Sequence, residues 1–273
     1  MRFRCGALVI EVSSHESHDD LYWKVFEGFA SEAQADVTVS LHVSDKGWRN
    51  VELDGPITWH IDHAAGAIDI GIPTWVAHLD LGRREVEATL ASDQVRTFAH
   101  LLAVVTQVYT TYLKRGLNLH ASAVVRDGRA VVFTARSETG KSTVARISKE
   151  LGCLVLTEEM ACVFGLGEGD VPVVQAMPLR ERGDLLVKEP VRAPLAAVYS
   201  LAQANDTSVE ELDRMQQVKR IAMASAIGVR DALLMEPALE MASQLVDRVP
   251  VKLLHFERSP RLWEVVDADL RQG

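Results

Sequence analysis

A run of eight residues near the middle of the chain has the composition of a phosphate-binding loop. The run consists of Ala135, Arg136, Ser137, Glu138, Thr139, Gly140, Lys141 and Ser142, and Thr143 follows it. In such a loop the lysine reaches the β- and γ-phosphates of a nucleotide, and the hydroxyl after it binds Mg²⁺. A glycine before the lysine lets the backbone approach the phosphates without a Cβ in the way. Lys141 and Ser142 therefore predict a site for ATP and Mg²⁺.

The segments on either side of the loop are of the kind that it requires. Residues 130–134 have the pattern of a buried strand, and residues 143–151 that of a helix. A strand, a loop and a helix in this order aim backbone N–H groups and the helix N-terminus at one anion. Glu138 is the exception, because like charges a few ångströms apart cost about 1 kcal/mol in water and more in a drier site. A loop that binds nucleotide weakly or not at all is the alternative.

Two adjacent carboxylates come directly after the next short apolar run, residues 154–156. They belong to Glu158 and Glu159. In α/β sheets a strand end beside a phosphate loop is where Mg²⁺ and the attacking group are held. One acid of the pair is then free to hold Mg²⁺ through water while the other accepts a proton from an incoming hydroxyl. A helix cap or a solvated acidic turn is the structural alternative.

His120 lies on the strand before the loop, in Leu119-His120-Ala121-Ser122-Ala123-Val124. This strand, a hairpin, a phosphate loop ending in Gly-Lys-Ser-Thr and a strand ending in two acids follow in order. The order resembles the C-terminal kinase domain of the HPr kinase/phosphorylase family, in particular its shorter HPr kinase-related branch. The resemblance covers roughly residues 116–266 and includes residues 249–256 leading to Trp263. It implies an α/β P-loop fold related to phosphoenolpyruvate carboxykinase.

The resemblance also implies roles for individual residues. Lys141 would bind phosphate, Ser142 would bind Mg²⁺, and His120 would support the acidic pair, in which the position after the loop makes Glu159 the candidate for holding Mg²⁺. Glu158 would act as the base toward a substrate serine. The sequence departs from the family in three places. Ala135 and Glu138 stand where glycines are usual, and the pair Glu158-Glu159 stands where two aspartates are usual. The longer acidic arms bear on activity, since a misplacement of about 1 Å can cost roughly 100-fold in rate.

The chain divides into two parts by pattern. Residues 1–115 predict a β-rich α+β N-terminal lobe with a connecting helix, and residues 116–273 predict the HPr-kinase-like P-loop domain. Alternating and apolar runs predict strands; these fall at residues 35–43, 57–62, 67–72, 79–89, 118–125, 160–164, 171–175, 195–201, 251–256 and 263–266. Helical segments are predicted at residues 16–33, 93–114, 209–227 and 231–246.

Composition narrows the class of protein. The 273 residues are 48% hydrophobic and 25% charged, with a net charge of −9, so a broad nucleic-acid or anionic-membrane surface is excluded. Three cysteines, Cys5, Cys153 and Cys162, show no metal spacing and indicate cytosolic free thiols. The longest apolar stretch, residues 98–113, is too short and too polar to span a bilayer. We expect a soluble cytoplasmic protein.

The function that these features predict is an ATP- and Mg²⁺-dependent kinase that phosphorylates a hydroxyl, most simply a serine of a protein or peptide. Arg180 and Arg182 are further candidates for stabilising transferred charge. A non-catalytic, kinase-like scaffold that binds a partner is the alternative that Glu138 favours. A nucleotide-switched ATPase or GTPase is a third class, and the absence of an Asn-Lys-x-Asp motif argues against the GTPase. Assembly into homo-oligomers is an expectation from the resemblance.

Overall fold

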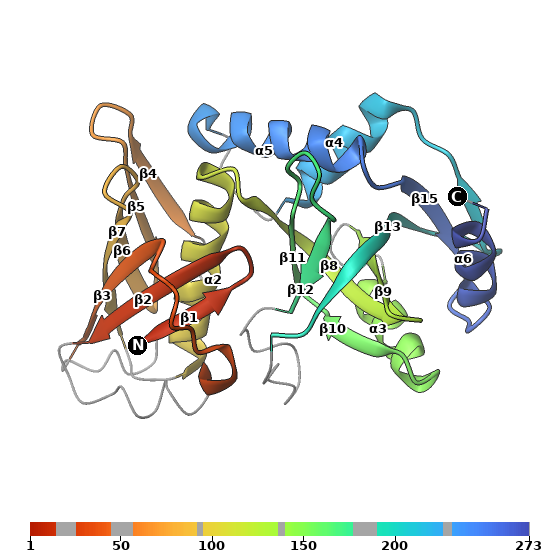
Figure 1. Cartoon of the computed structure of the whole chain (residues 1–273), viewed down its shortest axis with the longest axis horizontal. Helices are drawn as coiled ribbons and strands as arrows, with labels where there is room; N and C mark the ends of the chain where they lie inside the picture. Colours follow the sequence, from red (N-terminus) through yellow and green to blue (C-terminus); the bar gives the residue numbers. More distant parts are fainter. Residues whose placement is uncertain are drawn as a thin grey trace.

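The computed structural model describes residues 1–14, 26–44, 57–91, 95–135, 140–176, 190–225 and 231–272. Over these residues the chain is a mixed α/β protein with two sheets, one from each half of the sequence (Figure 1). The first sheet has seven strands and the second has eight. No helix in the described part of the chain combines the length and the apolarity needed to cross a bilayer.

The first sheet has the strand order β1-β2-β3-β7-β6-β5-β4. Its strands are β1 (Arg2–Cys5), β2 (Leu8–Ser14), β3 (Val37–Val43), β4 (Thr58–Asp62), β5 (Ala67–Ile72), β6 (Trp75–Asp80) and β7 (Glu85–Leu90). The alternating pattern of β3 and the hairpin of β4 with β5 are confirmed. The single strand expected over residues 79–89 is wrong, because residues 81–84 form a turn and the segment belongs to the β6–β7 hairpin.

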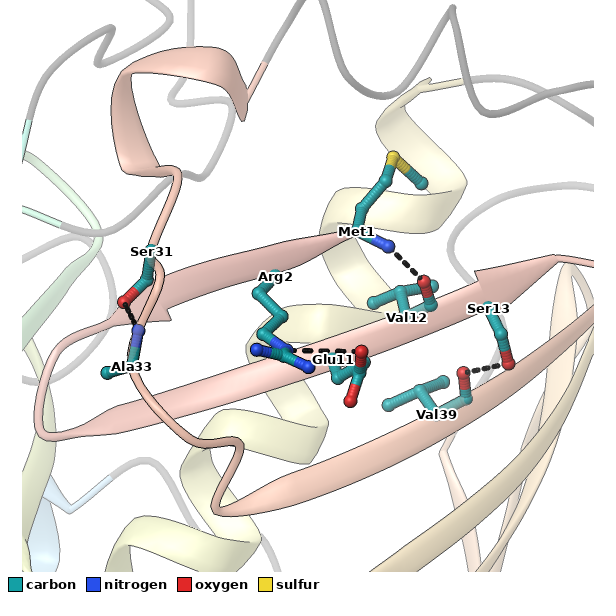
Figure 2. A network of polar contacts seen from close by, with 8 residues as sticks. All are labelled: Met1, Arg2, Glu11, Val12, Ser13, Ser31, Ala33 and Val39. Carbon is teal, nitrogen blue, oxygen red and sulfur yellow. Dashed lines mark hydrogen bonds and ion pairs between the residues drawn. The ribbon is translucent and has the colours of Figure 1, made fainter.

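Short polar contacts tie the beginning of the chain into this sheet (Figure 2). The nitrogen of Met1 donates to the carbonyl of Val12 at 2.7 Å, and Arg2 pairs with Glu11 across the two strands at 3.1 Å. Beyond them the helix expected over residues 16–33 is wrong in its last part. Only Glu27–Phe29 form a single 3₁₀ turn, η1, and the next residue, Ala30, bridges to β1. Residues 15–25 lie outside the described part.

Helix α2 (Val95–Tyr112) lies between the two sheets and confirms the helix expected there (Figure 1). Most of its residues are buried, including several threonines and Gln107 beside the apolar side chains. Its side chains share one core with the first sheet, and Cys162 and Leu234 from the second half of the chain join that core. The two halves are therefore packed together through α2.

The second sheet carries the phosphate-loop motif. Its strands are β8 (Gly116–Arg126), β9 (Arg129–Thr134), β10 (Leu154–Thr157), β11 (Met160–Phe164), β12 (Val173–Gln175), β13 (Arg192–Gln203), β14 (Ser208–Glu210) and β15 (Val251–Phe256). The predicted hairpin of β8 with β9 is confirmed. Pairings run from β8 through β9, β13, β12 and β11 back to β8, so these strands form a closed circuit. Strand β13 pairs in parallel with β9 and also in parallel with β15.

Four helices cover this sheet: α3 (Lys141–Glu150), α4 (Arg214–Ala224), α5 (Ala232–Val246) and α6 (Leu262–Leu270). Helices α3 and α6 share one core with the sheet, and α4 and α5 share another. The helix expected over residues 209–227 is wrong at its start. Residues 208–210 form β14, and Asp213 begins α4 with a capping box that includes Gln216.

The strand expected over residues 263–266 is wrong, because this segment is part of α6. Leu262, Trp263 and Val266 are buried on one side of that helix, a spacing of helical period. The indole Nε1 of Trp263 donates to the Ser148 hydroxyl of α3 at 3.0 Å, and its ring meets Phe133 of β9 edge to face. Trp263 thus fixes the helix that follows the phosphate loop.

We predict that Trp263→Ala lowers the free energy of unfolding by about 3–5 kcal/mol, because it leaves a large cavity between α3 and α6. Trp263→Phe should cost about 1–2 kcal/mol, since it keeps most of the packing and loses the hydrogen bond. Urea denaturation followed by circular dichroism measures both. Glu264→Gln, on the exposed side of the same helix, is the control, and an unfolding midpoint shared by Trp263→Ala and the control contradicts the prediction.

Candidate phosphate-binding site

The predicted loop joins the end of β9 to the start of α3. Thr134 ends β9, which runs parallel to β13, and Lys141 is the first residue of α3. The loop therefore lies at the carboxyl edge of parallel strands, where ligands of open α/β sheets bind. Ala135, Gly140 and Lys141 are described, whereas four of the predicted loop residues, Arg136, Ser137, Glu138 and Thr139, lie outside the described part.

Gly140 precedes α3 with a left-handed backbone, at a φ of +117°. An added Cβ would lie 2.4 Å from Cζ of Phe256, the last residue of β15. The position therefore requires glycine for two reasons, its backbone angle and the close approach of the aromatic ring. Phe256 is almost completely buried, so its ring cannot move aside freely. This contact sets the start of α3 against the end of β15.

Lys141 is 8% exposed, which is rare for a lysine. Its ammonium donates to the carbonyl of Ala135 at 3.1 Å, so the lysine reaches back across the loop. Ser142 is exposed and Thr143 half-buried in the first turn of α3, where backbone N–H groups have no partner within the helix. A buried ammonium, a hydroxyl and a helix N-terminus together form a donor set that fits a phosphate group.

The strand pairing brings the predicted histidine and acids to the same edge. Thr134 of β9 pairs with Ala121 of β8, and the N–H of Ala121 donates to the carbonyl of Glu159 at 3.1 Å. His120, the preceding residue of β8, is exposed and pairs with Met160. The chain bends at the two acids, because the Thr157 hydroxyl accepts hydrogen bonds from the N–H groups of Glu159 and Met160. The acids are thus two strands away from the loop.

The two acids differ in their surroundings. Glu158 is half-buried and Glu159 is exposed. Burial raises the pKa of Glu158, the nearby Lys149 ammonium of α3 lowers it, and the negative charge of Glu159 raises it, with a net rise. A glutamate with a raised pKa is better matched to proton transfer near neutral pH than an ordinary one. The raised pKa of Glu158 is thus one property that the general base predicted from the sequence would need.

The residues at this edge of the second sheet are compatible with a Mg²⁺ ion that a nucleotide would hold in large part. Mg²⁺ usually keeps several waters and takes one or two protein ligands together with substrate phosphates. Ser142 and Glu159, the two residues predicted to hold Mg²⁺, are both exposed and both have oxygen in the side chain. Within the described residues, no group of three or more His, Cys, Asp or Glu side chains is arranged to hold a metal ion without such a partner.

A pocket of about 360 Å³ opens beside the first residue of the loop, between the strand ends and α4. Thr134, Ala135 and Ser200 line it from the sheet, and Lys219 and Arg220 line it from α4. The sequence reasoning missed these two cations. A signal was present, since neither has a carboxylate three or four residues away on the helix to pair with. The arginines that were expected to serve, Arg180 and Arg182, lie outside the described residues.

Over the described residues, fold and site define a mixed α/β protein of two sheets with a strand–loop–helix motif at the edge of the second sheet. The family model of the SynChlorMet cassette protein ScmC matches residues 87–271, about two thirds of the chain. The chain belongs to this ScmC family.

Among solved structures, the chain is similar to the structure of the Hpr(Ser) kinase/phosphatase from Coxiella burnetii. The identity is 16% and the TM-score is 0.35, with 57% of this chain and 96% of that chain covered. This is a distant structural similarity. No curated protein matches the chain. The family assignment is therefore ScmC, and the likeness to HPr kinases extends no further than that distant similarity.

We predict that Gly140→Ala destabilises the protein by about 1–3 kcal/mol, through a strained backbone and the contact with Phe256. Gly152→Ala is the matched control beyond the other end of α3, since Gly152 also has a positive φ but no atom within 4 Å of an added Cβ. Urea denaturation should show a larger loss for Gly140→Ala, and Phe256→Leu in the same chain should restore part of it. Equal losses at the two glycines would show that Phe256 exerts no constraint.

We predict that the pKa of Glu158 lies above the ordinary value of a glutamate, about 4.3. Glu159→Gln should lower it, because the substitution removes a neighbouring negative charge, and Lys149→Met should raise it, because it removes a positive one. Carbon-detected NMR titration of the Glu158 carboxyl measures all three values. Shifts of the opposite sign, or none, contradict this description of the site.

Proposed function

We propose that this protein is a phosphotransferase that uses ATP and Mg²⁺ to phosphorylate a hydroxyl, a serine of a protein or peptide. The observation that carries the proposal is the buried Lys141 at the start of α3, with its ammonium turned back to the carbonyl of Ala135. A buried ammonium can make a strong, charge-assisted hydrogen bond to an anion that enters the site. A helix N-terminus at the same position favours a phosphate as that anion.

The bend that contains Glu158 and Glu159 supports the part of the proposal that concerns the second substrate, the hydroxyl acceptor. Glu158 lies two strands from the end of β9, has a raised pKa and is half-buried, whereas a purely solvated acidic turn would be exposed. In the proposed reaction Glu158 accepts the proton of the acceptor hydroxyl as its oxygen bonds to the γ-phosphorus. The bond from that phosphorus to the bridging oxygen breaks, and ADP leaves. His120 is proposed to support the acids from the neighbouring strand.

The other residues of the proposed site act by position and charge. Lys141 and the N–H groups of the first turn of α3 bind the phosphates and hold the nucleotide in line with the acceptor. Ser142 and Glu159 are the residues that would hold Mg²⁺, which neutralises charge on the transferred group when it is bound. Glu138, outside the described residues, is the residue whose carboxylate a bound polyphosphate must avoid.

A kinase-like scaffold without turnover remains the second candidate, because Glu138 and Ala135 stand where the resembled family has glycines. The two functions differ in one measurement. A kinase binds Mg-ATP in the absence of any partner, whereas a scaffold of this kind shows no binding at millimolar nucleotide. Calorimetric titration of the full chain with Mg-ATP separates them before any acceptor is known.

We predict that Lys141→Met weakens Mg-ATP binding by about 10- to 100-fold, because it removes a charged hydrogen bond to phosphate. Methionine keeps the buried apolar stem, so the fold should remain intact by circular dichroism. Arg146→Met, at an exposed position in the middle of α3, also removes one positive charge and should leave Mg-ATP binding unchanged.

Phosphate transfer provides the second readout. With γ-labelled ATP and a degenerate peptide library fixed at a central serine, we expect labelling by the unaltered protein and none by Lys141→Met or Glu158→Gln. Binding of Mg-ATP without transfer to any peptide would leave a nucleotide-binding protein of another kind. Mg-ATP binding that is equal in the unaltered protein and in Lys141→Met would refute the proposed site.

A further inference from the structure

Helix α4 places two positive charges in the pocket beside Ala135, the first residue of the phosphate loop. Lys219 and Arg220 line the pocket that begins at Thr134 and Ala135, and none of the described residues that line it is a carboxylate. Neither residue has a carboxylate partner within the described part of the chain. Arg214, on the same helix, is by contrast paired with Asp247 at 2.9 Å. In a chain with a net charge of −9, this pocket is a local exception.

The guanidinium of Arg220 is held in a fixed direction. Its Nη1 donates to the Ser200 hydroxyl at 2.9 Å, and Ser200 of β13 pairs directly with Thr134 of β9. The arginine is half-buried, and its other N–H groups have no partner in the described residues. A half-buried cation that is oriented but not neutralised is costly, and an oxyanion between α4 and the strand ends would remove that cost.

Among the described residues of the loop, Ala135 is the one that the pocket and the loop share. Ala135 lines the pocket, and its carbonyl receives the ammonium of Lys141. In phosphate loops that lysine serves the β- and γ-phosphates, while the backbone N–H groups cradle the phosphates nearer the sugar. An anion that touches both Lys141 and the pocket is therefore at the far end of the polyphosphate chain.

We propose that α4 completes the site from the opposite side, with Arg220, assisted by Lys219, binding the oxygens of the terminal phosphate of a nucleoside triphosphate. The inference rests on the proposed function, and it adds the group that distinguishes a triphosphate from a diphosphate. Ser200 is the positioning residue that aims the guanidinium. Neutralising the transferred group in this way is the task that an arginine from a separate element performs in other phosphoryl-transfer sites.

Calorimetric titration with Mg-ATP and Mg-ADP tests the proposal. We expect the unaltered protein to prefer Mg-ATP, and Arg220→Ala to lose about tenfold or more in Mg-ATP affinity with its Mg-ADP affinity little changed. Arg220→Lys should keep part of the preference. Ser200→Ala, which leaves the charge in place, should reduce the preference by less than Arg220→Ala. Arg192→Ala, an exposed arginine at the other end of β13, is the charge-matched control and should keep it.

Two results would overturn the assignment of Arg220. One is an equal loss of Mg-ATP and Mg-ADP affinity in Arg220→Ala, which would place the guanidinium elsewhere along the nucleotide. The other is an unchanged preference in a folded Arg220→Ala chain while Lys141→Met abolishes binding, in which case the proposed function stands and the role of α4 falls. Failure of the unaltered protein to bind either nucleotide refutes both.

Discussion

The parallel pairing of β9 with β13 is the constraint on which the candidate site depends. It puts Thr134 beside Ser200, so the strand that leads into the phosphate loop ends next to the hydroxyl that orients Arg220. The second neighbour of β9, β8, brings Ala121 and through it the carbonyl of Glu159 to the same level. One strand thus fixes the relative positions of the cations of α4, the start of the candidate phosphate loop and the bend at Glu158 and Glu159.

The closed circuit of pairings protects that arrangement. Each strand of the circuit has a neighbour on both sides, so a shift in register at β9 would have to be matched by shifts around the whole ring. A one-residue slip would also turn the apolar side chains of β9 to the other face. The end of β9 at Thr134 therefore has a fixed position, which is a condition for a preorganised binding site beside it.

Local patterns in the sequence were sufficient for much of the fold. Apolar and alternating runs predicted β3, β4 and β5, and the expected strand and hairpin before the phosphate loop correspond to β8 and β9, which carry His120. Trp263 misled the prediction, because the short run Trp263–Val266 has the apolar content of a strand, and only the buried spacing from Leu262 onward identifies a helix. A short apolar run is ambiguous until its packing partner is known.

The candidate site was predictable only where it is contiguous. The loop residues and the two acids can be recognised from the sequence because each forms a short, continuous motif. The tertiary structure adds that both motifs lie at the same edge of the second sheet. Lys219 and Arg220 lie far along the chain, and their relation to Ala135 depends on the pairing of β9 with β13. The missing carboxylates around them on α4 marked an unsatisfied charge, but the sequence did not show which element that charge would face.

The burial of α2 has a consequence for how the molecule unfolds. The helix is covered by the first sheet on one side, while Cys162 of β11 and Leu234 of α5 enter the same core from the other half. A fragment starting after α2 would expose these apolar surfaces to water, and the match to the ScmC family likewise begins before α2, at residue 87. Melting of either sheet therefore removes cover from the other, which couples the stability of the candidate site to a sheet that supplies none of the described residues assigned to it.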